Sequence, residues 1–237
     1  MYFLYYFSFA ASILGYGYFL SRFLKIQIKN IGVTGIIGIF FLTLISYISS
    51  LFIAHNYIFN SLILILGLAL FFYYVINSYF SKNDIFLFLI IYIVLFIFIL
   101  LAKNHDDFPY YHFPYTYLIT QTSHPFGLGL LNNGFRNPSS LFFFNSLLFL
   151  PKIDIYFLHL GSVYFLGFSN LFFIKNIFDK SNFKHLKFYN FLNLFCFILV
   201  NVLFVRLAEY GTDRGGQIFI LIGVLILLLL INNKPKL

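Results

Sequence analysis

The chain has 237 residues, of which 61% are hydrophobic and only 9% are charged, whereas soluble domains carry about 25% charged residues. This composition excludes a water-soluble globular fold and predicts an all-α membrane protein with several spanning helices. The formal charge of +8 does not indicate a nucleic-acid partner, because the Lys and Arg residues separate apolar runs instead of gathering on one face.

Seven apolar runs are long enough, or nearly so, to cross a bilayer as helices. In chain order they lie at 1–21, 31–54, 57–81, 85–102, 155–174, 188–205 and 215–231. The first run has no basic segment before it and no small-residue cleavage site after it, so we expect a retained helix and not a cleaved signal peptide. The single cysteine, Cys196, excludes an internal disulfide. The lipid bilayer is therefore the first predicted partner.

The basic residues predict the orientation, since cytoplasmic loops carry an excess of Lys and Arg. One set of loops holds ten of them, namely Arg22, Lys25, Lys29, Lys82, Lys175, Lys180, Lys184, Lys187, Lys234 and Lys236. The other set holds five, namely Lys103, Arg136, Lys152, Arg206 and Arg214. We expect an inner (plasma) membrane protein of bacterial type, with its N-terminus outside and its C-terminus in the cytoplasm. The loops 103–138 and 206–214 then meet at the outer face.

The polar segment 103–138 holds the first candidate site. Asp106 and Asp107 are adjacent, and their repulsion makes one of them easier to protonate, which suits a general base or a metal site. An ordinary solvated loop fits the same residues. Tyr110 follows Asp106 at helical spacing, and His112 is a candidate for substrate binding or for an interfacial hydrogen bond. We expect short helices in the outer membrane interface at about 110–122 and at 139–150, with Pro109 and Pro114 limiting the start of the first.

Further candidates are cations near the outer face. Arg136 precedes the predicted interfacial helix at 139–150, and four charges gather in the second outer loop, namely Arg206, Glu209, Asp213 and Arg214. Arginine at a membrane edge suits a phosphate-bearing lipid substrate, but the same charges fit a structural clamp between helices. The asparagines in the apolar runs, and His159, are expected to hydrogen-bond between helices.

The order of these features resembles the GT-C class of integral-membrane glycosyltransferases, which includes the lipid A aminoarabinose transferases and protein mannosyltransferases. In that class an outer loop opens with an acidic pair and a Tyr, as in Asp106-Asp107-Phe-Pro-Tyr110. A basic residue then precedes a proline step, as in Arg136-Asn-Pro138-Ser-Ser-Leu141. A later outer loop carries Arg and acidic residues, as in Arg206-Leu-Ala-Glu209-Tyr-Gly-Thr-Asp213.

The resemblance implies sugar transfer at the outer face from a polyprenyl-phosphate donor to a lipid, glycan or protein acceptor. Asp106 would be the general base, and Asp107 would orient the acceptor or help to hold a divalent cation. Residues 1–84 would be additional spans and 85–232 the GT-C-like portion of one transmembrane domain. The family usually has one span before the loop and more spans after it, so the resemblance implies a fragment, one half of a split enzyme or a degenerate copy. The alternatives are a transporter or flippase, and a non-catalytic subunit with a membrane partner chain.

Overall fold

The computed structural model describes the backbone of residues 1–77, 79–101, 106–124, 126–178, 187–203 and 213–232. Within these ranges the chain is helical and has no β-sheet, only an isolated bridge between Leu150 and Asp154. The long helices are α1 (Tyr2–Phe23), α2 (Ile31–Ser50), α3 (Tyr57–Ile76), α4 (Lys82–Leu101), α8 (Gly161–Phe178), α10 (Lys187–Leu203) and α11 (Asp213–Asn232). The short ones are η1 (Phe108–His112), α5 (Phe113–Gln121), α6 (Leu128–Leu131), η2 (Asn133–Phe135), α7 (Ser140–Ser146) and η3 (Ile155–Phe157). The predicted all-α class is confirmed.

Within the described residues, three helices, α1, α2 and α3, are long and apolar enough to cross a membrane. Shorter apolar stretches lie in α10 (Phe188–Val202) and α11 (Gly215–Ile231). Large apolar side chains remain exposed along these helices, as expected where lipid covers a protein surface. These features agree with the predicted membrane class.

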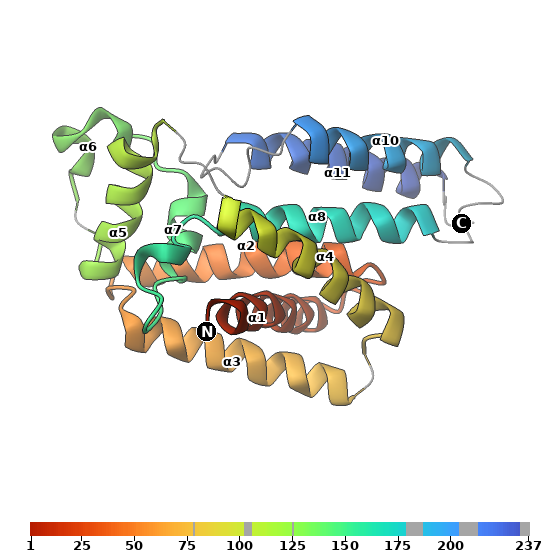
Figure 1. Cartoon of the computed structure of the whole chain (residues 1–237), viewed down its shortest axis with the longest axis horizontal. Coiled ribbons are helices and arrows are strands. Elements are labelled where there is room, and N and C mark those ends of the chain that lie inside the picture. The colour runs from red at the N-terminus through yellow and green to blue at the C-terminus, as the bar shows by residue number, and fades with distance from the viewer. Residues whose placement is uncertain (78, 102–105, 125, 179–186, 204–212, 233–237) are drawn as a thin grey trace.

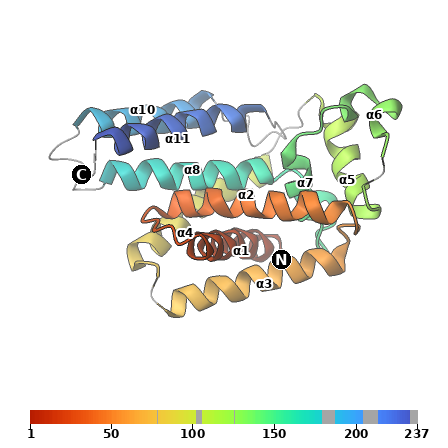
Figure 2. The same ribbon diagram turned by 180° about the vertical axis from the view of Figure 1, so that it is seen from behind.

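Consecutive long helices run in opposite directions, so the bundle has two ends (Figure 1). One end, which we call the α5–α7 end, carries the α2–α3 turn together with α5, α6 and α7. The opposite end, which we call the α1–α2 end, carries the α1–α2 and α3–α4 turns and the last turn of α8. Figure 2 shows the same separation from behind, with α10 ending and α11 beginning at the α5–α7 end.

Two predicted boundaries were wrong. The fifth long helix, α8, begins at Gly161, because residues 150–160 fold into a turn and the 3₁₀ helix η3. The predicted interfacial helix at 139–150 is reduced to the seven residues of α7. Residues 142–150 are buried, since α7 packs against α2, α5 and α8.

Glycines bring the long helices of the core into close contact. A Cβ atom added at Gly17 on α1 would overlap the Thr34 carbonyl oxygen on α2, and one added at Gly38 would overlap the Ile13 carbonyl oxygen on α1. A Cβ atom at Gly32 would likewise meet the backbone of α8 near Phe172. Small residues at such crossings are typical of helices that pack within a membrane.

Asparagines join the helices as predicted. Asn170 on α8 and Asn201 on α10 exchange two hydrogen bonds, of 3.0 and 2.8 Å. Asn176 donates to Asn193 at 3.2 Å between the same helices, and Asn145 on α7 accepts from the Gly161 amide at 2.9 Å. Asn190 departs from the pattern, because its buried amide has no hydrogen-bond partner within the described part of the chain.

Candidate functional site

A buried histidine fastens the α5–α7 end to the long helices. His55 lies in the α2–α3 turn and is fully buried. Its Nε2 lies 2.8 Å from the Ser49 hydroxyl and its Nδ1 lies 2.6 Å from the Ser146 hydroxyl on α7. The Ser146 hydroxyl also donates to the Phe143 carbonyl at 2.6 Å and the Ser49 hydroxyl to the Ser46 carbonyl at 3.3 Å, so the tautomer of His55 decides which ring nitrogen donates. Burial lowers the pKa of His55 to about 4, so the ring is neutral at physiological pH.

A second polar side chain, that of Asn60, joins the same segments; we call His55, Asn60 and their hydrogen-bond partners the anchor. The amide of Asn60 on α3 is fully buried and donates to the carbonyl oxygens of His55, Ser146 and Phe149, at 2.8, 2.9 and 2.8 Å. Two backbone bonds add to it: the His55 amide donates to the Ile119 carbonyl on α5 at 3.0 Å, and the His124 amide donates to the Ser50 carbonyl at 2.7 Å. The turn after α2 therefore positions both α5 and α7.

The adjacent carboxylates Asp106 and Asp107 lie just before η1. Asp106 is exposed and, among the described residues, makes no hydrogen bond or ion pair, whereas Asp107 is half-buried and accepts from the Tyr111 hydroxyl at 3.3 Å. The backbone of η1 follows the wider π-helical spacing, in which the Phe113 amide donates to the Phe108 carbonyl. Pro109 lies in the first turn of η1 and Pro114 in the first turn of α5, where proline is tolerated. The helix begins at Phe108, two residues before the predicted start.

The other two candidates on η1 point in different directions. Tyr110 is 72% exposed, and its carbonyl oxygen accepts from the Asn132 amide at 3.2 Å. His112 is buried, and its ring lies 5.0 Å from the ring of Phe142 on α7. His112 therefore belongs to the small core under η1 and α5, while Tyr110 is open to a ligand.

Arg136 borders a pocket of about 480 Å³ at the α5–α7 end, together with His124, the 126–130 segment, Phe135 and Pro138. The Nε atom of Arg136 donates to the Gly129 carbonyl at 3.3 Å, which holds the side chain along the pocket wall. Arg136 is exposed and forms no ion pair with any acid that the structure describes. The Nδ1 atom of His124 is buried without a hydrogen-bond partner, and burial lowers the pKa of this imidazole. The pocket thus offers one cation and one neutral imidazole.

A second cavity, an apolar groove, is lined by residues that follow Pro138 in the chain. Pro138 lines the pocket, and the next residue, Ser139, lines a groove of about 250 Å³ between α2, α7, α8 and α11. The groove is walled by Ile39, Phe40, Thr43, Ser139, Ser140, Leu141, Phe165, Gly215, Gly216 and Phe219. The rings of Phe40 and Phe219 meet at 5.1 Å and close it on one side. A pocket with one cation and an apolar groove, linked through consecutive residues of the chain, can hold the two parts of an amphipathic molecule.

The structure describes only the end of the second charged loop, from residue 213 onward. Arg206 and Glu209 lie outside the described residues. Asp213 and Arg214 form the first turn of α11, next to the groove residues Gly215 and Gly216. The backbone therefore puts these two candidates at the α5–α7 end of the bundle (Figure 1). Asp106 and Arg136 adjoin η1 and η2, which contact each other and, through η1, α5.

Sequence reasoning missed His124 and the anchoring role of His55. A histidine between two long apolar runs was the available signal, but its serine partners are 6 and 91 residues away. No group of three or more His, Cys, Asp or Glu side chains within the described residues could hold a metal ion.

Comparison with known proteins gives one match. The chain belongs to the family of the domain of unknown function DUF8201, whose model matches residues 1–236. No curated protein and no solved structure matches the chain.

Proposed function

We propose that this member of the DUF8201 family is a membrane glycosyltransferase with seven spanning helices, which transfers a sugar from a polyprenyl-phosphate donor to a lipid, glycan or protein acceptor. The observation that carries the proposal is that a pocket lined by Arg136 and an apolar groove have consecutive residues, Pro138 and Ser139, in their linings. Asp106 directly precedes η1, which contacts α5 and η2 at the same end of the bundle. A polyprenyl phosphate joins an anionic group to a long apolar tail, so it matches both parts of this surface.

In the proposed reaction the acceptor hydroxyl gives its proton to Asp106 and its oxygen bonds to the anomeric carbon of the sugar. The bond from that carbon to the phosphate oxygen breaks, and polyprenyl phosphate leaves with the electron pair. Asp106 suits the base role because its carboxylate is exposed, whereas Asp107 is held by Tyr111 and suits an orienting role. Arg136 and the cations of the second loop, Arg206 and Arg214, stabilise the departing phosphate.

The surface around the pocket supports a reaction at the membrane interface. Phe126, Leu130 and Leu131, on and beside α6, are 93%, 89% and 82% exposed. Apolar side chains this exposed favour insertion into the interfacial layer of a bilayer, where the donor phosphate lies. The direction of the chain, with the α5–α7 end outside, follows from the distribution of Lys and Arg and is part of the proposal.

The test is sugar transfer in proteoliposomes. Vesicles holding the purified chain receive undecaprenyl-phosphate hexoses and pentoses labelled in the sugar, with a membrane lipid extract as acceptor. We expect label to reach the acceptor with the native chain, and Asp106→Asn to abolish turnover. The matched control is Asp154→Asn, which removes a carboxylate at the same end that is bonded to the Tyr57 hydroxyl. Unchanged turnover in Asp106→Asn would refute the base role, and flux of a labelled solute without transfer would favour a transporter.

A further inference from the structure

The α1–α2 end has a basic pocket that the proposed sugar transfer does not use. This pocket has a volume of about 420 Å³ and is lined by Tyr18, Ser21, Arg22, Lys25, Ile26, Gln27, Ile28, Lys29 and Tyr79. Its lining has three cations and no acid. The nearby Asp84 is engaged elsewhere, since it accepts from Ser81 at 2.8 Å and forms an ion pair with Lys175. The positive charge of the pocket is therefore not neutralised by the described residues around it.

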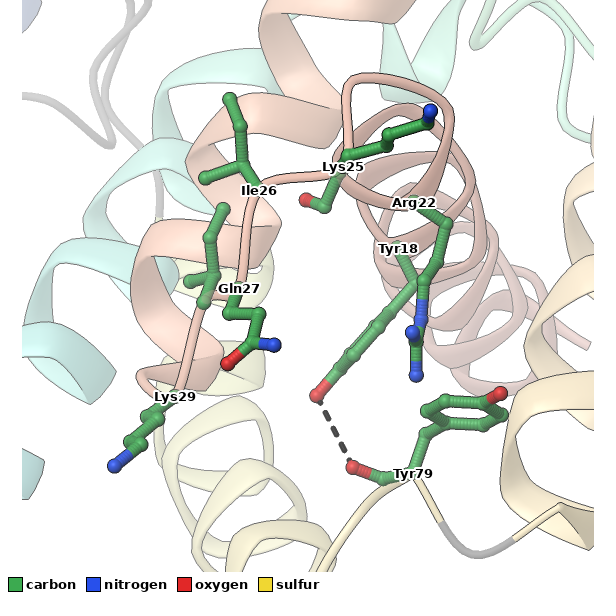
Figure 3. A pocket seen from close by; sticks show the side chains of 9 residues that line it. Tyr18, Arg22, Lys25, Ile26, Gln27, Lys29 and Tyr79 are labelled. Atoms are coloured by element: carbon green, nitrogen blue, oxygen red, sulfur yellow. Dashed lines mark hydrogen bonds between the residues drawn. The ribbon is translucent and has the colours of Figure 1, made fainter.

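Hydrogen-bond donors surround the opening (Figure 3). The side chains of Tyr18, Arg22 and Gln27 point toward it, whereas Lys25 and Lys29 lie at its rim with their ammonium ends directed outward. The guanidinium of Arg22 lies 4.3 Å from the centre of the Tyr79 ring, and the Tyr18 hydroxyl donates to the Tyr79 carbonyl at 3.3 Å. This contact holds the guanidinium over the Tyr79 ring, and a planar guanidinium suits recognition of a phosphate.

Lys25 adopts a backbone conformation that is unfavourable for a residue with a side chain. Lys25 has a φ of +56° directly after the end of α1. Its amide donates to the Arg22 carbonyl at 3.0 Å and the Ile26 amide donates to the Ser21 carbonyl at 2.9 Å, which is the helix-ending Schellman arrangement. Glycine usually holds this position, because the left-handed region is unfavourable for side chains. A lysine near a helix C-terminus also stabilises the helix dipole, but that role requires neither a cavity nor the left-handed position.

Exposed apolar side chains flank the pocket on the side of α1. Phe19 and Phe23 stack at 6.4 Å between ring centres, and Phe23 is 73% exposed. Leu24 and Ile26 are also exposed. A cationic pocket bordered by exposed apolar groups at the end of predicted membrane helices matches a phospholipid better than a soluble anion, because both the phosphate and the first part of the acyl chains find a partner.

We propose that the pocket lined by Arg22, Lys25 and Lys29 binds the phosphate of an anionic lipid headgroup. This inference is independent of the proposed sugar transfer, since it concerns the opposite end of the bundle and other residues. The distribution of Lys and Arg predicts that this end faces the cytoplasm, where the membrane surface is negatively charged.

The experiment measures binding of short-chain phosphatidylglycerol to the purified full-length chain in a neutral detergent. Phosphatidylcholine of the same chain length and inorganic phosphate are the two comparison ligands. We expect phosphatidylglycerol to bind in preference to both. Arg22→Gln, Lys25→Gln and Lys29→Gln together should weaken that binding on the order of a hundredfold, from about fivefold for each cation near a membrane surface.

Two further proteins keep the test decisive. Lys25→Gly removes one cation and suits the positive φ, so it should fold at least as well as the native chain and bind about fivefold more weakly. The control carries Lys82→Gln, Lys234→Gln and Lys236→Gln, which remove the same charge from the same predicted side without touching the pocket lining. Native affinity in the pocket variants, or an equal loss in the control, would overturn the site. Displacement of the lipid by an equal concentration of inorganic phosphate would overturn the lipid assignment.

Discussion

The buried His55 predicts a loss of stability in mild acid. Burial lowers its pKa from 6.5 to about 4. Between these pH values His55 binds a proton in the unfolded chain but not in the folded chain. Stability is therefore complete above about pH 6.5 and falls as the pH drops toward 4. The interval of about 2.5 pH units at 1.36 kcal/mol each corresponds to about 3 kcal/mol.

The assay is thermal unfolding followed by circular dichroism in detergent between pH 4 and pH 7. A loss of about 3 kcal/mol in a chain of this length lowers the melting temperature by about 6–12 °C. His55→Gln cannot take up the proton, so it should lower the melting temperature at pH 7 but reduce the further fall toward pH 4. Carboxylates and the other buried histidines contribute equally to both proteins, so the difference between the two profiles isolates His55. Parallel profiles would refute the reasoning.

Two other substitutions test the packing. Asn60→Ala leaves three buried carbonyl oxygens without their donor and should cost about 2–3 kcal/mol of unfolding free energy, with Asn77→Ala, exposed at the other end of α3, as the control. Equal melting temperatures of the two variants would contradict the anchor. Gly38→Ala should cost about 1–3 kcal/mol, because the added methyl meets the α1 backbone at Ile13. Gly223→Ala, where nothing lies within 4 Å of an added Cβ, should be neutral or slightly stabilising; the reverse order in thermal unfolding would contradict the glycine contacts.

The sequence alone determined the helical class and the approximate positions of the long helices. An apolar run of membrane length is most stable as a helix in a bilayer, because a helix satisfies the backbone hydrogen bonds of its own residues. Asn145, Asn193 and Asn201 were also predicted correctly as links between helices, since an amide within an apolar run needs a partner. Helix formation and the need of a buried amide for a partner are local properties, and both can be predicted from neighbouring residues in the chain.

Only the tertiary structure decided how the polar side chains are used. His112 and Tyr110 are two residues apart, yet one packs under Phe142 and the other is exposed. The serines around His55 are far from each other in the chain, and so are the two walls of the groove along α2 and α11. Contacts of this kind depend on how whole helices cross, and close crossings are set by small residues whose partners no local pattern reveals.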